Sequence, residues 1–188
     1  MNNKQDKAFT LVELMVVISI IGILSGLLLG AVLSAKRSAQ KKAVRVTIEQ
    51  LRSAIEVYHT ENQMYPPTSL SYFKGGGTHG ANAGIESLVY CLSTKQKGDV
   101  YMEFKEDRLQ NHDNDKLTKV LNPASVYGTT LWEYVDSWGN PFVYFNSADY
   151  AKPSAFAKYT GETASFSAIP QKSAKTKIYH NDSSYMIW

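Results

Sequence analysis

Residues 8–33 read AFTLVELMVVISIIGILSGLLLGAVL, and the rest of the chain can be placed relative to this apolar segment. Between Phe9 and Leu33 the only charged side chain is that of Glu13. A helix over this stretch is about 37 Å long, which is enough to cross a hydrocarbon core of about 30 Å. We therefore expect one membrane-spanning helix. An acid at the bilayer centre costs up to about 3 kcal/mol, so Glu13 is a candidate functional residue.

Two alternatives exist for this apolar segment. A secretory signal peptide has a basic start, which Lys4 and Lys7 supply, but its apolar region spans about 7–15 residues and ends in a small-x-small cleavage site. The apolar run over residues 14–33 is too long, and the best cleavage candidate, residues 32–34, fits that pattern poorly. A plain signal anchor explains the length and leaves Glu13 as an interfacial residue without a role.

A third interpretation comes from the polar leader, the small residue Ala8, and the sequence FTLVEL that precedes the apolar run. This pattern resembles the processing motif of type IV pilins and type II secretion pseudopilins. The resemblance implies that a membrane-embedded prepilin peptidase cleaves between Ala8 and Phe9 and methylates the new amine of Phe9. Glu13 would then be the family's acidic fifth residue. The family usually has Gly before the cut, where this chain has Ala8.

Charge gives no partner by itself, because the formal net charge of +3 makes no case for nucleic-acid binding. Five basic residues follow the apolar segment within residues 36–45, whereas only Lys4 and Lys7 precede it. The positive-inside rule would place the C-terminal side in the cytoplasm. The leader motif implies the opposite orientation, which we adopt. The expected location is the inner membrane before assembly, in a single pass with the head in the periplasm, and the pseudopilus afterwards.

Glycine recurs every fourth residue within the apolar segment, at Gly22, Gly26 and Gly30. The three positions share one helix face, where the backbone of another helix can approach closely. Glycine is also common in membrane helices, so the spacing alone leaves both explanations open. Together with Glu13, these glycines are the candidate residues for filament assembly.

Beyond the membrane segment, a 4-3-4-3 spacing of apolar residues predicts that the helix continues with one buried stripe, made of Val44, Ile48, Leu51, Ile55 and Tyr58. On its polar face Arg52 and Glu56 stand at i,i+4 and can interact modestly. The helix is expected to end near Asn62, because Pro66 and Pro67 follow.

A second helix is predicted to begin at Asn82 as its cap and to bury one apolar face, made of Ile85, Leu88, Val89 and Leu92. Residues 75–80 contain the pattern GxGxxG, but no buried strand precedes it, so a nucleotide site is not expected. Cys91 is the only cysteine and is predicted to be a buried, small apolar residue.

Residues 100–104 are predicted to form a strand, and residues 111–115, NHDND, are rich in oxygen ligands. A calcium-binding EF-hand does not fit, since Lys116 stands where the loop needs Gly and Asn122 stands where it needs Glu. We expect a solvated loop that caps a short helix around residues 117–121.

The C-terminal third is predicted to be β structure, with strands at 131–135, 141–145 and 185–188 and a turn at 136–140. The sequence VDSWGNPFVY resembles the DPWGNPYxY hairpin of the G-type major pseudopilin of type II secretion, with Ser137 replacing the usual Pro. YPPT and GIESLV also match that family, so the resemblance runs from Ala8 to about Asn146.

Past Asn146 the resemblance fades. The family's last strand leads into an Asp-rich loop that binds a structural calcium ion, and this chain has no recognisable equivalent. Residues 147–182 are expected to form a long surface loop. We carry over no calcium ligands and expect neither a metal ion nor a cofactor: either the calcium site is absent or something else does its work.

The predicted fold is α+β: a long N-terminal helix, membrane-spanning in its first half, packed on a head with a second helix and a small antiparallel sheet. Its parts are a leader (1–8), a membrane and assembly segment (9–33) and a periplasmic head (34–188). The sequence lacks HExxH, CxxC, GxSxG and P-loop motifs, so we expect no enzyme.

The resemblance implies a pseudopilin subunit of a type II secretion system, which assembles into a helical pseudopilus that drives protein export across the outer membrane. Its partners would be further copies of itself, the prepilin peptidase, the inner-membrane assembly platform and minor pseudopilins, with no nucleic acid. A type IV pilin-like subunit for adhesion or DNA uptake and a single-pass, membrane-anchored binding module are the alternatives.

Overall fold

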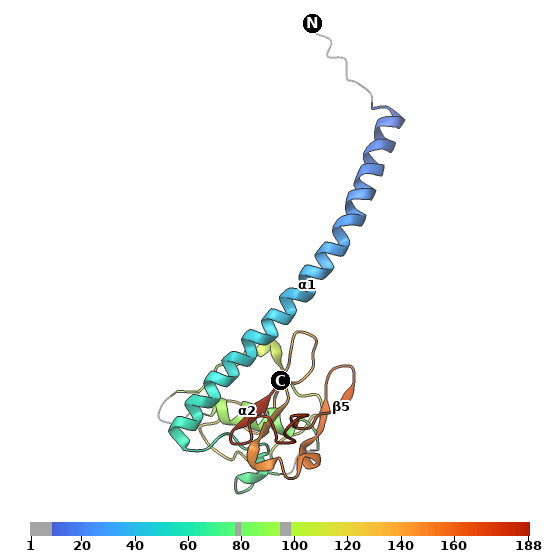
Figure 1. Ribbon diagram of the computed structural model, residues 1–188. Helices are drawn as coiled ribbons and strands as arrows, with labels where there is room; N and C mark the ends of the chain where they lie inside the picture. The colour runs from blue at the N-terminus through green and yellow to red at the C-terminus, as the bar shows by residue number, and fades with distance from the viewer. Residues whose placement is uncertain (1–8, 78–79, 95–98) are drawn as a thin grey trace. The chain divides into compact units, whose positions relative to one another are not determined.

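The computed structural model describes residues 9–77, 80–94 and 99–188. The chain divides into two compact units, Met1–Ala43 and Val44–Trp188, and each is described by itself. Helix α1 (Leu11–Asn62) contributes its first part to one unit and its last part to the other (Figure 1). The predicted leader, including Ala8, lies outside the described residues.

In the first unit, α1 exposes its apolar side chains on all sides from Leu11 to Leu33. Within the described residues, α1 is the one helix that is long and apolar enough to cross a membrane, and none of its apolar window is buried. This arrangement is what the composition of the segment predicts. A helix that is apolar all round needs a membrane or other helices around it.

The second unit, which we call the head, begins with the last part of α1. The predicted stripe is confirmed, because Leu51, Ile55 and Tyr58 are buried, and Val44 and Ile48 pack partly buried against the same core. The buried face also includes Thr47 and Ala54. The helix ends at Asn62, four residues before Pro66, as expected.

The predicted interaction between Arg52 and Glu56 on the polar face of α1 is wrong. Arg52 forms its ion pair with Glu49, one turn earlier, at 3.3 Å. Glu56 instead accepts a long hydrogen bond of 3.5 Å from the hydroxyl of Tyr65. The chain folds back after α1 and brings Tyr65 beside the helix, so Glu56 has a partner that helical spacing could not reveal.

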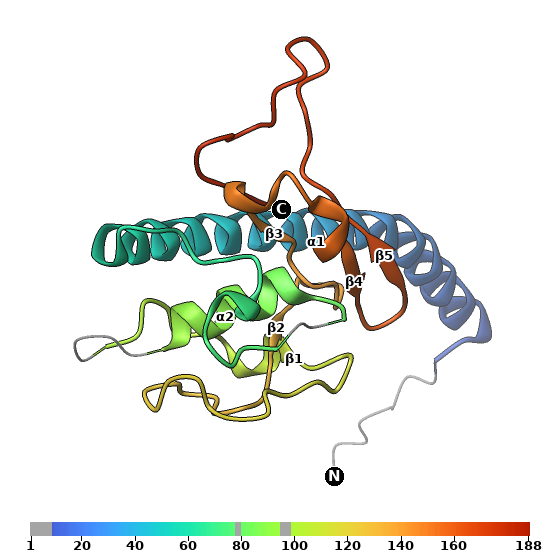
Figure 2. The same ribbon diagram turned by 90° about the horizontal axis from the view of Figure 1, so that it is seen from below.

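Helix α2 (Ala83–Ser93) is buried over its entire length and lies against two strands of the head, β2 (Glu133–Tyr134) and β3 (Tyr144–Asn146) (Figure 2). Asn82 precedes it, as predicted, but does not cap it: its φ is 54° and its side chain makes no cap hydrogen bond. The side chain is drawn away from the helix because it bonds to Glu133 and Thr160 in the neighbouring strands.

The described residues form three antiparallel two-stranded sheets, which together with the helices confirm an α+β fold. The pairs are β1 (Leu109–Gln110) with β2, β3 with β6 (Tyr185–Ile187), and β4 (Lys158–Thr160) with β5 (Ser165–Ser167). Short 3₁₀ turns lie between the helices and strands along the chain: η1 (Leu70–Tyr72), η2 (Glu106–Arg108), η3 (Ser147–Asp149) and η4 (Pro153–Phe156).

The predicted turn at residues 136–140 is present. One oxygen of Asp136 accepts hydrogen bonds from the backbone N–H of Trp138 at 2.8 Å and of Asn140 at 3.0 Å. Gly139 has a φ of +80°, which glycine adopts without strain. The flanking strands are shorter than predicted, because the chain changes partner after the turn and β3 pairs with β6 rather than with β2.

Two predicted elements are absent. Residues 100–104 form no strand: the N–H groups of Tyr101 and Met102 both donate to the carbonyl of Leu92 and close the end of α2. Residues 117–121 form no helix, since the N–H of Leu117 donates to the carbonyl of Thr129 across a bridge with the following segment. In both cases a tertiary partner takes the backbone groups that a local element would have used.

The prediction of a long surface loop at residues 147–182 is wrong in its first half. This region contains η3, η4 and the β4–β5 hairpin. Tyr159 of β4 is fully buried, and its hydroxyl donates to the carbonyl of Tyr144 in β3 at 3.3 Å. Three-residue strands among serine, lysine and threonine carry little hydrophobic alternation, which is why the pattern missed them.

Candidate functional site

The start of α1 is closed by a reciprocal pair of side chains, Thr10 and Glu13. Oε2 of Glu13 accepts from the backbone N–H of Thr10 at 2.9 Å and from its hydroxyl at 2.8 Å. The hydroxyl of Thr10 in turn accepts from the backbone N–H of Glu13 at 3.2 Å. This is a capping box, in which otherwise unpaired donors at a helix start are satisfied. Glu13 therefore has a local partner on its own chain.

The capping box was missed by the sequence interpretation, although its signal is present. T-L-V-E at residues 10–13 fits the pattern of a Ser or Thr followed three residues later by Glu, directly before an apolar run. The interpretation considered the cost of the Glu13 charge and a role of Glu13 in assembly, but not a bond to Thr10. The structure adds a second role for Glu13, because its carboxylate fixes where α1 begins.

Gly22, Gly26 and Gly30 all lie on α1, and a Cβ added at any of them would meet nothing within 4 Å. Their face of the helix is thus open among the described residues. Phe9 is 73% exposed, just before the capping box. The cleavage at Ala8 and Phe9, the methylation of Phe9 and the assembly role of Glu13 and the three glycines stay predictions.

A second group of polar side chains lies inside the head, between α2 and the loop that follows β1. We call Glu86, Asp113 and Asp115 the acidic cluster: one ligand oxygen from each lies within 4.8 Å of the others. Glu86 comes from the first turn of α2 and is fully buried. Asp113 and Asp115 are half-buried members of the oxygen-rich loop at residues 111–115. These are the residues that could hold a metal ion.

The acidic cluster rests on Glu133, a fully buried acid in β2 that has its own hydrogen bonds. Its Oε1 accepts from Nδ2 of Asn82 at 2.8 Å, and its two oxygens accept from the backbone N–H of His112 at 3.3 and 3.2 Å. Asn82 directly precedes α2 and His112 belongs to the loop. Glu133 therefore links the start of α2 to the loop at residues 111–115, the two segments that supply the acidic cluster.

The pKa values of these acids reflect their burial. Burial raises the pKa of Glu86 to about 10, with the nearby charges of Asp115 and Asp113 contributing in the same direction. Burial also raises the pKa of Glu133 to about 7, against the opposing effect of its hydrogen bond from Asn82. The pKa of Asp113 is raised as well, through burial and the charge of Asp115.

The sequence interpretation found the loop but not the cluster. It compared residues 111–115 with an EF-hand and looked for the remaining acid further along the same loop. The acid that meets Asp113 and Asp115 is Glu86, which lies earlier in the chain and reaches the loop through tertiary packing. A single Glu within the apolar run of the second helix was the only available signal.

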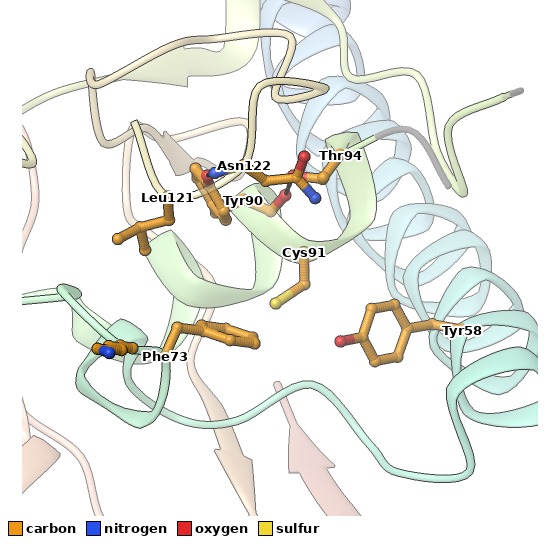
Figure 3. Close-up of a pocket in the computed structure, with 8 residues that line it drawn as sticks. Tyr58, Phe73, Tyr90, Cys91, Thr94, Leu121 and Asn122 are labelled. Carbon is orange, nitrogen blue, oxygen red and sulfur yellow. Dashed lines mark hydrogen bonds between the residues drawn. The ribbon is translucent and has the colours of Figure 1, made fainter. Parts of the chain in front are cut away.

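The head also contains a cavity of about 280 Å³ between the end of α2 and the last part of α1, lined partly by aromatic side chains (Figure 3). Cys91 lies on this cavity with Tyr58 and Phe73. Burial raises the pKa of the Cys91 thiol to about 12, so the thiol stays protonated and is a weak nucleophile. The prediction of a buried, small apolar cysteine is confirmed in its burial.

The described structure thus combines a membrane-capable N-terminal helix with a compact α+β head, which is the architecture of a pilin-like protein. Residues 3–29 match the family model described as the prokaryotic N-terminal methylation motif. The chain is also 28% identical to "Type II secretion system core protein G" of Pseudomonas aeruginosa over 144 residues, covering 77% of this chain and 76% of that protein. No solved structure matches the chain.

The N-terminal motif and the similarity to core protein G together support the type IV pilin-like family, and within it the type II secretion pseudopilins.

Proposed function

We propose that the chain is a pseudopilin subunit of a type II secretion system. It is held in the inner membrane by α1 with its head in the periplasm, it is cut between Ala8 and Phe9 by a prepilin peptidase, and it then assembles into a helical pseudopilus. The filament acts with the inner-membrane assembly platform and minor pseudopilins to drive protein export across the outer membrane. The role is structural rather than catalytic.

The observation that carries this proposal is the exposed apolar surface of α1 from Leu11 to Leu33, a stretch whose one charged residue, Glu13, lies near its start. A plain anchor needs the length of this helix but not the acid. A filament needs both, because apolar helices from neighbouring subunits replace the lipid around each helix. The open face at Gly22, Gly26 and Gly30 allows such helices to approach closely. A heterologous contact that does not close into a ring produces a filament.

Glu13 is proposed to receive the new amine of Phe9 from a neighbouring subunit. Within one helix the two groups are poorly placed, since four residues span about 6 Å of rise. The capping hydrogen bonds from Thr10 use Oε2, so Oε1 can face the neighbour. Pairing the two charges in apolar surroundings offsets part of the cost of placing each one there, and it fixes the axial step between subunits.

The test separates the charge of Glu13 from its capping role. Glu13→Gln keeps an oxygen that can accept from Thr10 but removes the charge, whereas Glu13→Ala removes both. We expect both variants to be processed normally, to keep a stable head, and to fail in filament formation and in secretion of a reporter protein. Thr10→Val is the matched control, because it weakens the cap and keeps the charge.

Filaments of normal length and normal secretion from Glu13→Gln cells would show that Glu13 acts as a cap alone. In that case the charge-pairing mechanism would be abandoned. If the protein forms filaments but a strain that lacks it secretes normally, an adhesion or DNA-uptake filament would be favoured over a secretion pseudopilus.

A further inference from the structure

Glu86 is the most unusual side chain of the head, because it is an acid with no exposed surface and no hydrogen bond. Its relative exposure is 0%, and neither carboxylate oxygen has a hydrogen-bond partner among the described residues. A buried polar group without a partner is rare in folded proteins, since it loses its hydration and gains nothing in exchange. The carboxylate of Glu86 therefore needs a partner that is not one of these side chains.

The acidic residues around Glu86 strengthen the argument that its carboxylate needs a binding partner. Its carboxylate lies with those of Asp113 and Asp115, and no described lysine or arginine forms an ion pair with Glu86. Like charges held together in a buried place repel one another. A positively charged ligand at the centre of the cluster would remove both the repulsion and the missing bonds.

The geometry of the acidic cluster fits a single ion. One oxygen from each acid lies within 4.8 Å of the other two. Calcium binds oxygen at 2.3–2.6 Å, so two ligands of one calcium ion can be up to about 5.2 Å apart. The smaller magnesium ion binds at 2.0–2.1 Å and holds its ligands within about 4.2 Å. Oxygen atoms within 4.8 Å of one another are thus compatible with either ion.

The loop holds its two acids in place before any ion binds. Nδ2 of Asn111 donates to the carbonyl of Asp115 at 3.0 Å, and the N–H of Asp115 donates to Oδ1 of Asn111 at 3.2 Å. These two bonds close the loop around Asn114, whose φ of 57° is left-handed. The opposite wall is fixed by Glu133, which bonds to both Asn82 and His112 and so keeps Glu86 facing the loop.

We propose that Glu86, Asp113 and Asp115 bind one hard divalent cation, tested here as Ca²⁺, which joins α2 to the loop after β1. Carboxylate oxygens without thiol or imidazole ligands favour such cations over zinc or copper. The site stabilises the head and has no catalytic role. It differs in place from the family's calcium loop, which follows the last strand, whereas this cluster lies before the hairpin at residues 136–140.

The experiment uses the full chain in detergent micelles, first treated with EGTA. Equilibrium dialysis with ⁴⁵Ca²⁺ should show one ion bound per chain. Extracellular calcium sites have dissociation constants of about 10⁻⁴–10⁻³ M. With Ca²⁺ about 100-fold above the dissociation constant, the Tm should rise by about 5–10 °C over its value in EGTA, by mass action on the native state.

Glu86→Gln is the decisive variant, because the amide keeps the size of the side chain and removes its charge. It should lose the Ca²⁺-dependent rise in Tm, yet in EGTA it should unfold at the temperature of the unmodified chain or above. An ordinary structural defect would lower the Tm in both conditions. Glu106→Gln, at an exposed acid of η2, is the matched control and should keep the full response to Ca²⁺.

The proposal is overturned if the unmodified chain binds no ⁴⁵Ca²⁺ and its Tm is the same in Ca²⁺ and EGTA, which would mean that a proton on Glu86 is enough. It is equally overturned if Glu86→Gln keeps the rise in Tm. If Glu86→Gln does not fold, Asp113→Asn decides the question by the same two measurements.

Discussion

Gly84 lies where α2 packs against β3 so closely that no side chain fits. A Cβ at this position would overlap the carbonyl oxygen of Tyr144 and lie 2.7 Å from the hydroxyl of Tyr159. The first of these groups is backbone and cannot rotate away. Gly84→Ala therefore forces α2 and β3 apart by a distance on the order of 1 Å, which forfeits a quarter to a half of each dispersion contact across the gap.

The expected cost follows from that gap. Overpacking of a core costs about 1–3 kcal/mol, and a clash with backbone belongs at the upper end. Alanine returns up to about 1 kcal/mol through its higher helix propensity, which leaves a net loss of about 2 kcal/mol. For a chain of this size the Tm should fall by about 4–8 °C.

The assay is thermal unfolding of the full chain in micelles, followed by circular dichroism. Gly80→Ala is the matched control, since a Cβ at Gly80 would meet nothing within 4 Å, and its Tm should stay close to that of the unmodified chain. A Gly84→Ala variant that melts at the unmodified temperature, or above it, would refute the close packing of α2 on β3.

Two further predictions concern the interior of the head. Asn82→Ala removes the bonds to Glu133 and to both backbone groups of Thr160, and should lower the free energy of unfolding by about 3 kcal/mol, because buried groups lose their partners; a loss below about 1 kcal/mol in urea unfolding would contradict this bonding. Cys91 should resist iodoacetamide at pH 8 until denaturant is added, since burial keeps its thiol protonated, and fast labelling of the native chain would show that it is exposed.

Much of the helical part of the fold could be predicted, because it is encoded in local periodicity. The stripe from Val44 to Tyr58 repeats with the period of a helix, and the double proline at Pro66 and Pro67 marks the end of α1. The turn at residues 136–140 was also predictable, since Asp and Gly stand where the turn needs an acceptor and a positive φ. In these places one short segment contains the whole signal.

The rest depended on partners far along the chain. Residues 100–104 have the composition of a strand, but their N–H groups close the end of α2 instead of pairing with another strand. Tyr159 is fully buried although its strand is otherwise polar, because it meets Tyr144 in the core. No pattern within either segment identifies such a partner.

The candidate sites divide in the same way. The position of Glu13 follows from an apolar run with one acid, and its bond to Thr10 follows from a capping box that the sequence contains. The acidic cluster could not be predicted, because Glu86 and the loop at residues 111–115 come together only after α2 packs against β2. An acid within an apolar helical face is a useful signal. The prediction of a head without a metal ion did not take it into account.

The intact mass of the protein purified from its own cells tests the proposed pseudopilin role most directly. The expected mature chain begins at Phe9, lacks residues 1–8 and carries one additional methyl group on its N-terminal amine. A plain anchor would keep the leader, and a secretory signal would be removed in a single piece with the apolar segment. A mature protein that retains residues 1–8, or one that begins after Ser34, would contradict the account.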